Sequence, residues 1–332
     1  MIVTLTPNPS LDRTIELAGP LARGDVQRAV AAHQEPGGKG VNICRALEAS
    51  GVRSLAILPG DIDDPVLLAL TAVGIPHWGL PIGATLRSNV AITEPDGTTT
   101  KLNEPGPTLT ATQQRDLVEL VLEKAEGASW LVLAGSLPPG VPASFYADIT
   151  RELRSRFGAD APYVAIDSSG APLAAAVAAR PDLIKPNAEE LAELTGLPDP
   201  DALEADPDLV VTTARTLIES GVGAVLATLG SAGAVLVTAD GAWLARGPKI
   251  VARSTVGAGD SALAGYLLSH TAGASASQCL RQAAAHGAAA ASLPGSTVPS
   301  LDQTQPDTIT VTALAAAVPA LVPPAHPKED DQ

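Results

Sequence analysis

Aromatic residues are almost missing from this chain of 332 residues, in which Phe, Trp and Tyr together make up 2% of the sequence. Alanine, valine and leucine dominate, so we expect an aliphatic core. Lysine and arginine are also scarce, and the formal net charge of −15 argues against nucleic acid as a partner. Any phosphate-bearing ligand must therefore be bound by a few local cations. The length allows one large domain or two ordinary ones.

Cysteine occurs only at Cys44 and Cys279, far apart and without the spacing of a metal site. This pattern fits buried thiols in a reducing compartment better than a disulfide framework. Residues 1–7 lack a basic region and a cleavage site, so we expect no signal peptide there. Every apolar run of membrane length is interrupted by charge, glycine or proline. These features favour a soluble cytoplasmic protein with no membrane partner.

Strand-like apolar runs alternate with helical patterns along most of the chain. Strands are expected at 2–6, 55–58, 130–134, 163–167, 183–184 and 224–229, with a hairpin over 234–245. Helices are expected at 64–74, 110–126, 145–157, 172–179, 187–195, 209–220, 262–270, 277–291 and 310–319. Strands of this continuous apolar kind, alternating with helices, predict an α/β fold with a parallel sheet covered on both faces. We expect a single domain over 1–322 and a disordered tail over 323–332.

Two groups of short, exposed-looking strands interrupt this alternation in the first third of the chain. They are expected at 14–17 and 26–31, and again at 87–93 and 98–103. Such insertions indicate a small β-sheet lid made from about residues 13–35 and 86–104. Because exposed strand edges need covering, we expect the lid to form the interface of a homodimer as well.

The segment Ser254-Thr255-Val256-Gly257-Ala258-Gly259-Asp260-Ser261 directly precedes the helix expected at 262–270. Its glycines allow a tight turn whose N–H groups face one spot, and the helix adds a positive dipole end. The loop is therefore suited to bind an anion, with Asp260 beside it as a base that accepts a hydroxyl proton in phosphoryl transfer. An aspartate after glycines is also ordinary at the start of a helix, so the loop alone leaves both interpretations open.

Two further motifs begin helices and have similar double interpretations. The segment 37–42, Gly-Gly-Lys-Gly-Val-Asn, can approach a ligand closely, but its spacing is not that of a Walker A loop. In 185–190, Lys-Pro-Asn-Ala-Glu-Glu, Asn187 and Glu190 match a helix cap and its capping-box partner. The functional interpretation has Lys185 at phosphates, with Asn187 and Glu190 holding Mg²⁺ through water.

Two loops that follow expected strands are weaker candidates for ligand-binding segments. The segment 229–233, Leu-Gly-Ser-Ala-Gly, is either a turn between strands or a surface for a nucleotide. The segment 135–140, Gly-Ser-Leu-Pro-Pro-Gly, is either a plain loop or part of a site, because open sheets bind ligands at strand ends.

The motifs together, in this order, resemble those of the ribokinase/PfkB-type carbohydrate kinases. The matching segments are Thr-Leu-Thr-Pro-Asn-Pro-Ser-Leu-Asp at 4–12, Gly-Gly-Lys-Gly at 37–40, Gly-Ser-Leu-Pro at 135–138, Lys-Pro-Asn-x-x-Glu at 185–190, Leu-Gly-x-x-Gly at 229–233 and Thr-Val-Gly-Ala-Gly-Asp at 255–260. The resemblance covers about residues 2–320 and is strongest to the branch that acts on hexose phosphates.

The resemblance implies a three-layer α/β/α body with a β-sheet lid, use of ATP with Mg²⁺, and dimers joined through their lids. Asp260 would be the base, with Gly257, Ala258 and Gly259 as the anion hole. The nucleotide would contact Lys185, Asn187, Thr228, Gly230, Gly233, Ser254 and Thr255, and the metal Asn187 and Glu190 through water. The sugar phosphate would contact Asp12, Gly37, Gly38, Lys39, Asn42 and Arg87, with help from Arg28 on the lid.

The acceptor expected from the resemblance is fructose 1-phosphate, giving fructose 1,6-bisphosphate. One departure favours another sugar phosphate, because many family members acting on fructose 1-phosphate have Lys where this chain has Ala91. Family members that act on tagatose 6-phosphate also have Ala at this position, so tagatose 6-phosphate is the main alternative acceptor. Fructose 6-phosphate is another acceptor of the same branch, and a nucleoside or ribose kinase is possible by fold. A non-catalytic sugar-phosphate sensor is a further alternative, although such a protein is expected to lose Asp260 or the glycines beside it.

Overall fold

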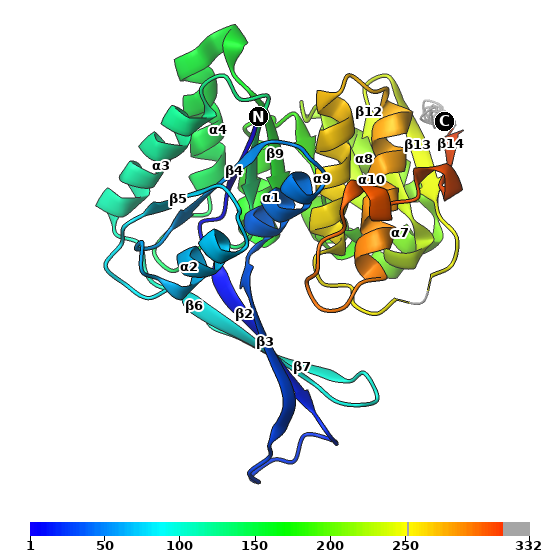
Figure 1. Ribbon diagram of the computed structural model, residues 1–332. Coiled ribbons are helices and arrows are strands. Elements are labelled where there is room, and N and C mark those ends of the chain that lie inside the picture. The colour runs from blue at the N-terminus through cyan, green and yellow to red at the C-terminus, as the bar shows by residue number, and fades with distance from the viewer. Residues whose placement is uncertain (251, 315–332) are drawn as a thin grey trace, which may run out of the picture.

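A ten-stranded sheet forms the centre of the computed structural model, which describes residues 1–250 and 252–314 (Figure 1). Its strands are β1 (Ile2–Leu5), β4 (Ser54–Pro59), β5 (His77–Leu80), β8 (Trp130–Ala134), β9 (Tyr163–Asp167), β10 (Leu183–Ile184), β11 (Ala224–Thr228), β12 (Ala234–Thr238), β13 (Gly241–Arg246) and β14 (Thr310–Leu314). Their order is β14-β13-β12-β11-β10-β9-β8-β1-β4-β5. The strands from β11 to β5 in this order are parallel, and β12, β13 and β14 extend the sheet in antiparallel fashion.

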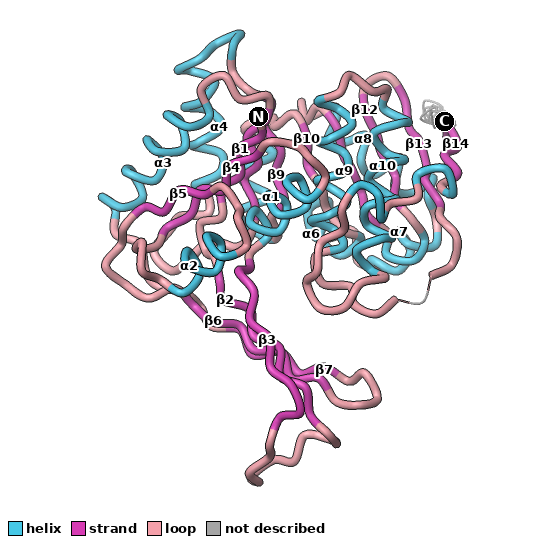
Figure 2. The backbone as a smooth tube through the Cα atoms, in the orientation of Figure 1, coloured by secondary structure: helices cyan, strands magenta, loops and turns pink. Residues whose placement is uncertain are grey.

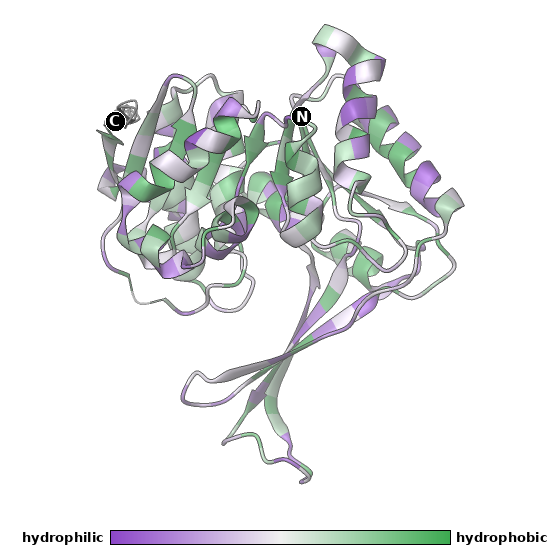
Figure 3. Cartoon of the chain, turned by 180° about the vertical axis from the view of Figure 1, so that it is seen from behind, coloured by the Kyte–Doolittle hydropathy of each residue, from purple (hydrophilic) through white to green (hydrophobic). Residues whose placement is uncertain are grey.

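Strand β1 lies inside the sheet, between β4 and β8. Val3 is opposite Leu55 on one side and Leu131 on the other. All residues of β1 and β8 are buried, as expected for parallel strands that are covered on both faces. Figure 3 shows apolar residues concentrated in these central strands.

Helices cover both faces of the sheet. One hydrophobic core contains residues of α3 (Ala111–Ala125), α4 (Phe145–Phe157), α5 (Gly170–Val177), α6 (Ala188–Thr195), α7 (Pro200–Ala205) and α8 (Pro207–Glu219). The core on the other face contains residues of α1 (Lys39–Ala49), α9 (Ala258–Thr271) and α10 (Ala276–Ala291). A smaller core beside β4 contains residues of α1 and α2 (Pro65–Ala72). Short 3₁₀ turns lie at 158–160, 230–232, 301–303 and 306–308.

A separate four-stranded sheet projects from the body and corresponds to the expected lid (Figures 1 and 2). It consists of β3 (Ala29–Gly37), β2 (Ser10–Leu17), β6 (Arg87–Thr93) and β7 (Thr99–Asn103), in that order. The strands β2 and β3 are longer than the expected 14–17 and 26–31, and residues 26–28 lie in the loop that connects them. The lid strands therefore reach down to the body, which brings Ser10, Gly37 and Arg87 close to the main sheet.

The helix expected at 310–319 is wrong for the residues that the structure describes. Residues 310–314 form strand β14, which pairs antiparallel with β13. The β-branched residues at 308–312 favour a strand, whereas the alanines that follow suggested a helix. Residues 315–319 and the tail expected at 323–332 lie outside the described residues.

Other differences from the expected elements are smaller. Strand β5 and helix α7 were not expected, and α9 begins at Ala258 instead of residue 262. Cys44 and Cys279 are buried and unpaired, as expected. Among the described residues, no helix combines the length and the apolar character needed to span a membrane.

Candidate active site

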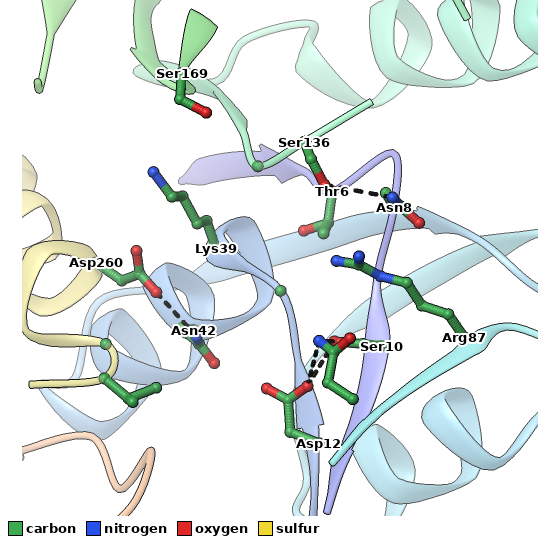
Figure 4. A pocket seen from close by; sticks show the side chains of 15 residues that line it. Thr6, Asn8, Ser10, Asp12, Lys39, Asn42, Arg87, Ser136, Ser169 and Asp260 are labelled. Carbon is green, nitrogen blue, oxygen red and sulfur yellow. Dashed lines mark hydrogen bonds between the residues drawn. The ribbon is translucent and has the colours of Figure 1, made fainter. Parts of the chain in front are cut away.

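A cavity of about 350 Å³ lies where the carboxyl ends of the parallel strands meet the root of the lid (Figure 4). Open α/β sheets bind ligands at this edge. Residues from the lid, from α1, from the strand ends and from the start of α9 line the cavity. They are Thr6, Asn8, Ser10, Asp12, Gly38, Lys39, Asn42, Arg87, Asn89, Gly135, Ser136, Ser169, Val256, Gly257 and Asp260.

One wall of the cavity is the loop that begins α9. Gly257 has φ of 75°, a left-handed conformation that glycine adopts without strain, and the helix starts at the next residue. The first N–H groups of a helix have no acceptor within the helix, so they are available to an anion at this point. A side chain on Gly259 would place its Cβ 3.1 Å from the Lys185 ammonium, which lies directly behind the loop. The glycines therefore allow both the turn and the close approach of a cation.

Asp260 lies in the first turn of α9 and is 7% exposed. Its Oδ2 accepts a hydrogen bond of 2.9 Å from the side-chain amide of Asn42, on α1. Burial, together with the negative charge of Asp167, raises the pKa of Asp260 to about 6, although Asn42, Lys39 and Lys185 act in the opposite direction. The carboxylate is thus ionised at neutral pH, yet more basic than an ordinary aspartate, which suits a general base.

Asp167 pairs with two lysines, of which Lys39 lines the cavity and Lys185 lies beside Gly259. It ends strand β9 and is fully buried, with Oδ1 at 2.7 Å from the Lys39 ammonium and Oδ2 at 3.2 Å from that of Lys185. Burial alone would raise the pKa of Asp167, but the two ammonium groups outweigh it and hold the pKa below its usual value. Lys39 also approaches Glu190 Oε1 at 3.4 Å. A chain of alternating charges therefore lies between α1 and α6.

The lid supplies a polar cluster around Asp12. Its Oδ1 accepts hydrogen bonds from Ser10 Oγ at 2.7 Å and from Asn89 Nδ2 at 3.0 Å. A Cβ on Gly37 would lie 2.1 Å from Asp12 Oδ2, so only glycine leaves room for this carboxylate. Burial raises the pKa of Asp12, and the hydrogen bonds and Arg87 moderate the effect. Gly38, with φ of 114°, would carry a Cβ only 2.6 Å from Thr6.

Arg87 begins strand β6, and its guanidinium faces the cavity (Figure 4). It donates one hydrogen bond of 3.1 Å to the backbone carbonyl of Glu104, while its Nε is buried without a partner. Burial lowers the pKa of Arg87 from its ordinary value, although the carboxylates of Asp12 and Glu104 act in the opposite direction. The site thus carries a cation on the lid side, well separated in sequence from the lysines of the body.

The structure brings together around the cavity only some of the residues singled out from the sequence. Those that line it are Asp12, Gly38, Lys39, Asn42, Arg87, Gly257 and Asp260, with Gly37, Ala258 and Gly259 next to them in the chain. The Lys39 ammonium, expected at the sugar, is bonded to Asp167 and Glu190. Arg28 is exposed in the lid loop and does not line the cavity of its own chain.

None of the residues expected to contact a nucleotide lines this cavity, and most of them lie at neighbouring strand ends. Asn187 caps α6 through a capping box with Glu190 and forms a parallel bridge with Thr228. Gly230 and Gly233 bound the turn between β11 and β12, where a Cβ on Gly233 would lie 2.1 Å from the Ala245 carbonyl oxygen. Ser254 and Thr255 precede the anion loop, and the carbonyl of Ala291 in α10 accepts hydrogen bonds from the N–H groups of Arg253 and Ser254.

The sequence indicated no individual role for several residues of the site, which are Thr6, Asn8, Ser10, Asn89, Asp167 and Ser169. Gly135 and Ser136 also line the cavity, and they belong to the segment 135–140 that was one of the two weaker candidates. Most of these follow expected strands, and a polar residue directly after a buried strand was the available signal. For Asp167 that signal was weak, because its partner Lys39 is 128 residues away in sequence.

Comparison with known proteins gives a consistent result over nearly the whole chain. The family model described as pfkB family carbohydrate kinase matches residues 6–303. A curated relative, "1-phosphofructokinase" of Rhodobacter capsulatus, is 36% identical over 296 residues, which cover 86% of this chain and 88% of that protein.

Two solved structures, both of phosphofructokinase-2 from Escherichia coli, are similar in fold and sequence. The complex with fructose 6-phosphate has a TM-score of 0.79 at 30% identity and covers 87% of this chain and 93% of that one. The tetrameric inhibited form has a TM-score of 0.81 at 31% identity and covers 91% of this chain and 96% of that one.

Proposed function

Because this chain belongs to the pfkB family of carbohydrate kinases, we propose that it transfers a phosphoryl group from ATP to fructose 1-phosphate, giving fructose 1,6-bisphosphate. The observation that carries this proposal is the pairing of Asp260 with the anion loop at one side of the cavity and Arg87 at the other. A base beside an anion site suits phosphoryl transfer to a hydroxyl. The guanidinium of Arg87, on the other side of the cavity, suits an acceptor that already carries a phosphate.

Asp260 acts as the general base in this proposal. The C6 hydroxyl oxygen of the sugar attacks the γ-phosphorus of ATP, its proton passes to Asp260, and the bond between the γ-phosphorus and the leaving ADP oxygen breaks. The N–H groups of Gly257, Ala258 and Gly259 stabilise the negative charge on the phosphoryl oxygens, and that of Ala258 turns to them from a long contact of 3.4 Å with the Thr255 carbonyl. Asn42 orients the carboxylate by its hydrogen bond.

ATP is placed along the strand ends next to the anion loop. Lys185 supplies positive charge behind Gly259, and Lys39 supplies it at the base of the cavity. Thr228, Gly230, Gly233, Ser254 and Thr255 contact the nucleotide in this proposal.

Magnesium fits this site through water, not through direct ligation. Among residues 1–250 and 252–314, no group of three or more His, Cys, Asp or Glu side chains could hold a metal directly. Asn187 and Glu190 bond each other's backbone N–H groups, and Glu190 also bonds Lys39. Their oxygen atoms suit the water shell of a hard cation that the ATP phosphates hold. When bound, Mg²⁺ supplies positive charge to the phosphate oxygens.

The acceptor lies between the lid and α1. Asp12, Gly37, Gly38 and Asn42 contact its hydroxyls, and Arg87 binds its phosphate through paired N–H donors. Ala91, the departure from related kinases, lies directly opposite Lys101 in the lid sheet. Residues opposite each other on neighbouring strands point to the same face, so an ammonium is still available there. Tagatose 6-phosphate remains the second candidate because of Ala91.

The lid also forms a homodimer interface in this proposal. Val26, Val30 and Leu102 are 100%, 63% and 58% exposed on the lid, more than expected for unpartnered apolar residues. Arg28 lies between Val26 and Val30 in the chain, is exposed and does not line the cavity of its own chain, so in this proposal it contributes to a partner's site. The similar structure described as tetrameric supports an oligomer, and the pairing through the lid is our inference.

The test is kcat/KM for fructose 1-phosphate, fructose 6-phosphate, tagatose 6-phosphate and free fructose, in a coupled assay of ADP release. Replacing Asp260 by Ala should lower kcat by ~100-fold or more. Arg87→Ala removes a charge-assisted contact of about 1.5–3 kcal/mol and should lower kcat/KM for the sugar phosphate by about 10- to 150-fold. A tenfold preference for tagatose 6-phosphate would correct the acceptor but leave the mechanism intact. A preference for free fructose, unaffected by Arg87→Ala, would refute the phosphate-binding role.

A further inference from the structure

Asn8 connects the two sides of the proposed phosphate-binding end of the cavity. It lies in the connection from β1 to the lid strand β2 and is 5% exposed. Its side-chain amide donates to the backbone carbonyl of Pro105 at 3.1 Å. The same amide donates to Ser136 Oγ at 3.3 Å, as Figure 4 shows. A carbonyl can only accept, so the contact with Pro105 fixes the amide with its NH₂ group toward these two partners.

This orientation determines what the Ser136 hydroxyl can do. Ser136 Oγ accepts a hydrogen bond from the Asn8 amide. The O–H group of Ser136 therefore remains free to donate toward the cavity, which Ser136 lines. A hydroxyl that donates is the form that binds a phosphate oxygen. Asn8 therefore gives Ser136 the donor role that an anionic ligand requires.

The other partner of Asn8 belongs to the segment that holds Arg87. The guanidinium donates to the carbonyl of Glu104, the residue before Pro105. The next residue, Gly106, has φ of 89°, and a Cβ there would lie 2.2 Å from Asn8 Oδ1 and 3.4 Å from Arg87 Cδ. Segment 104–106 thus packs between Asn8 and Arg87, so the position of one depends on the other.

We propose that Asn8 is a positioning residue for a phosphate monoester, which it serves by orienting the Ser136 hydroxyl as a donor and by fixing segment 104–106 beside Arg87. This rests on the proposed function, in which Arg87 binds the phosphate of the acceptor. The side chain of Asn8 acts on affinity for the phosphorylated sugar and leaves the chemistry at Asp260 unchanged.

The decisive variants are Asn8→Ala and the isosteric Asn8→Asp, with Thr4→Val as the matched control. Thr4 lies in β1, four residues earlier, and its buried hydroxyl has no hydrogen-bond partner, so removing that hydroxyl loses no contact. Asn8→Ala should raise KM for fructose 1-phosphate by roughly tenfold, the scale of one or two lost hydrogen bonds. Asn8→Asp should raise it by roughly 100-fold, because the carboxylate accepts the hydrogen bond of the Ser136 hydroxyl, which then no longer donates to the ligand, and because its charge repels the phosphate.

Readouts beyond this KM separate positioning from a general loss of structure. The kcat at saturation, KM for ATP and kcat/KM for free fructose should stay within about twofold of wild type, as should every constant of Thr4→Val. In an Arg87→Ala background, Asn8→Ala should raise KM for fructose 1-phosphate by a much smaller factor than in wild type, because the two residues act on one phosphate. Melting temperatures of all variants check that the fold is retained.

Distinct outcomes overturn the two proposals. If wild type converts fructose 1-phosphate but the Asn8 variants do not raise its KM, or raise KM for ATP equally, the role of Asn8 is refuted alone. The role of Asn8 would also be refuted if the effects of Asn8→Ala and Arg87→Ala on KM were fully additive in free energy. If wild type converts no sugar phosphate, the proposed function fails and the role of Asn8 fails with it. If another sugar phosphate is preferred, the same comparison with its unphosphorylated form tests Asn8 in the same way.

Discussion

Replacing Asp260 by Asn should make the protein more stable at neutral pH while it removes the activity. The raised pKa of Asp260, about 6 against 3.8 for an ordinary aspartate, means that the folded state binds the proton more tightly than the unfolded state. Keeping this buried carboxylate ionised therefore costs folding free energy at pH 7. An asparagine has the same shape, can still accept the hydrogen bond from Asn42, and carries no charge.

The magnitude follows from the difference between the two pKa values. At about 1.4 kcal/mol for each pH unit, the penalty at pH 7 amounts to about 3 kcal/mol. This is an upper value for Asp260→Asn, because Lys39 and Lys185 lose an anionic neighbour while they remain paired with Asp167. A gain of 1–3 kcal/mol in the free energy of unfolding corresponds to a rise in Tm of roughly 2–4 °C for a chain of this length.

The sign of the pH dependence makes the test specific. Since the folded-state pKa is the higher one, the stability contributed by the protonated group is fully present below pH 4 and is lost as the pH rises through 6. The stability advantage of Asp260→Asn should therefore be largest at pH 7 to 8 and should disappear toward pH 4. Thermal unfolding of both proteins over this range measures it. A variant that is no more stable than wild type at pH 7, or an advantage that does not change with pH, would refute the reasoning.

Three further predictions concern other parts of the molecule. Burial lowers the pKa of His286 to about 4, below its value when unfolded, so its contribution to stability should be lost as pH falls from about 6.5 to 4; His286→Gln should flatten that part of a plot of Tm against pH. Tyr146→Phe should cost only about 1 kcal/mol, measured by urea unfolding, because Ser168 still donates to the Gly135 carbonyl that Tyr146 shares. Val26→Asp together with V30D should convert a dimer to monomers in light scattering at micromolar concentration, whereas an unchanged mass would exclude the lid as the interface.

Much of the fold could be predicted because local signals and tertiary structure agree. The central strands are continuous apolar runs, and the helix at α3 begins with a capping box that the sequence already displays at Thr110 and Gln113. The expected helix at 310–319 failed because the strand at 310–314 is stabilised by pairing with β13, a partner that is distant in sequence. The lengths of β2 and β3 were underestimated because a two-sided lid sheet shows little hydrophobic alternation.

The residues of the site also fall into those that local motifs indicate and those that depend on tertiary contacts. Residues within glycine-rich or capping motifs, such as Gly257, Asp260 and Lys39, could be identified from spacing and residue type. Asp167 could not, because its importance comes from the neighbouring positions of β9 and β10 in the sheet and from a lysine on α1. The orientation of Asn8 likewise depends on contacts with residues 97 and 128 positions away.

The order of strands in the main sheet has a consequence for how the chain acquires its structure during synthesis. From β8 to β14 each strand neighbours the next one along the chain, so this half can add strands in the order in which they leave the ribosome. Strand β1 is made before both of its neighbours, β4 and β8, and its second edge is covered only when residues 130–134 have been made. The N-terminal third therefore has an unpaired, mainly apolar strand edge until β8 pairs with β1, and a chain in this state is prone to aggregation.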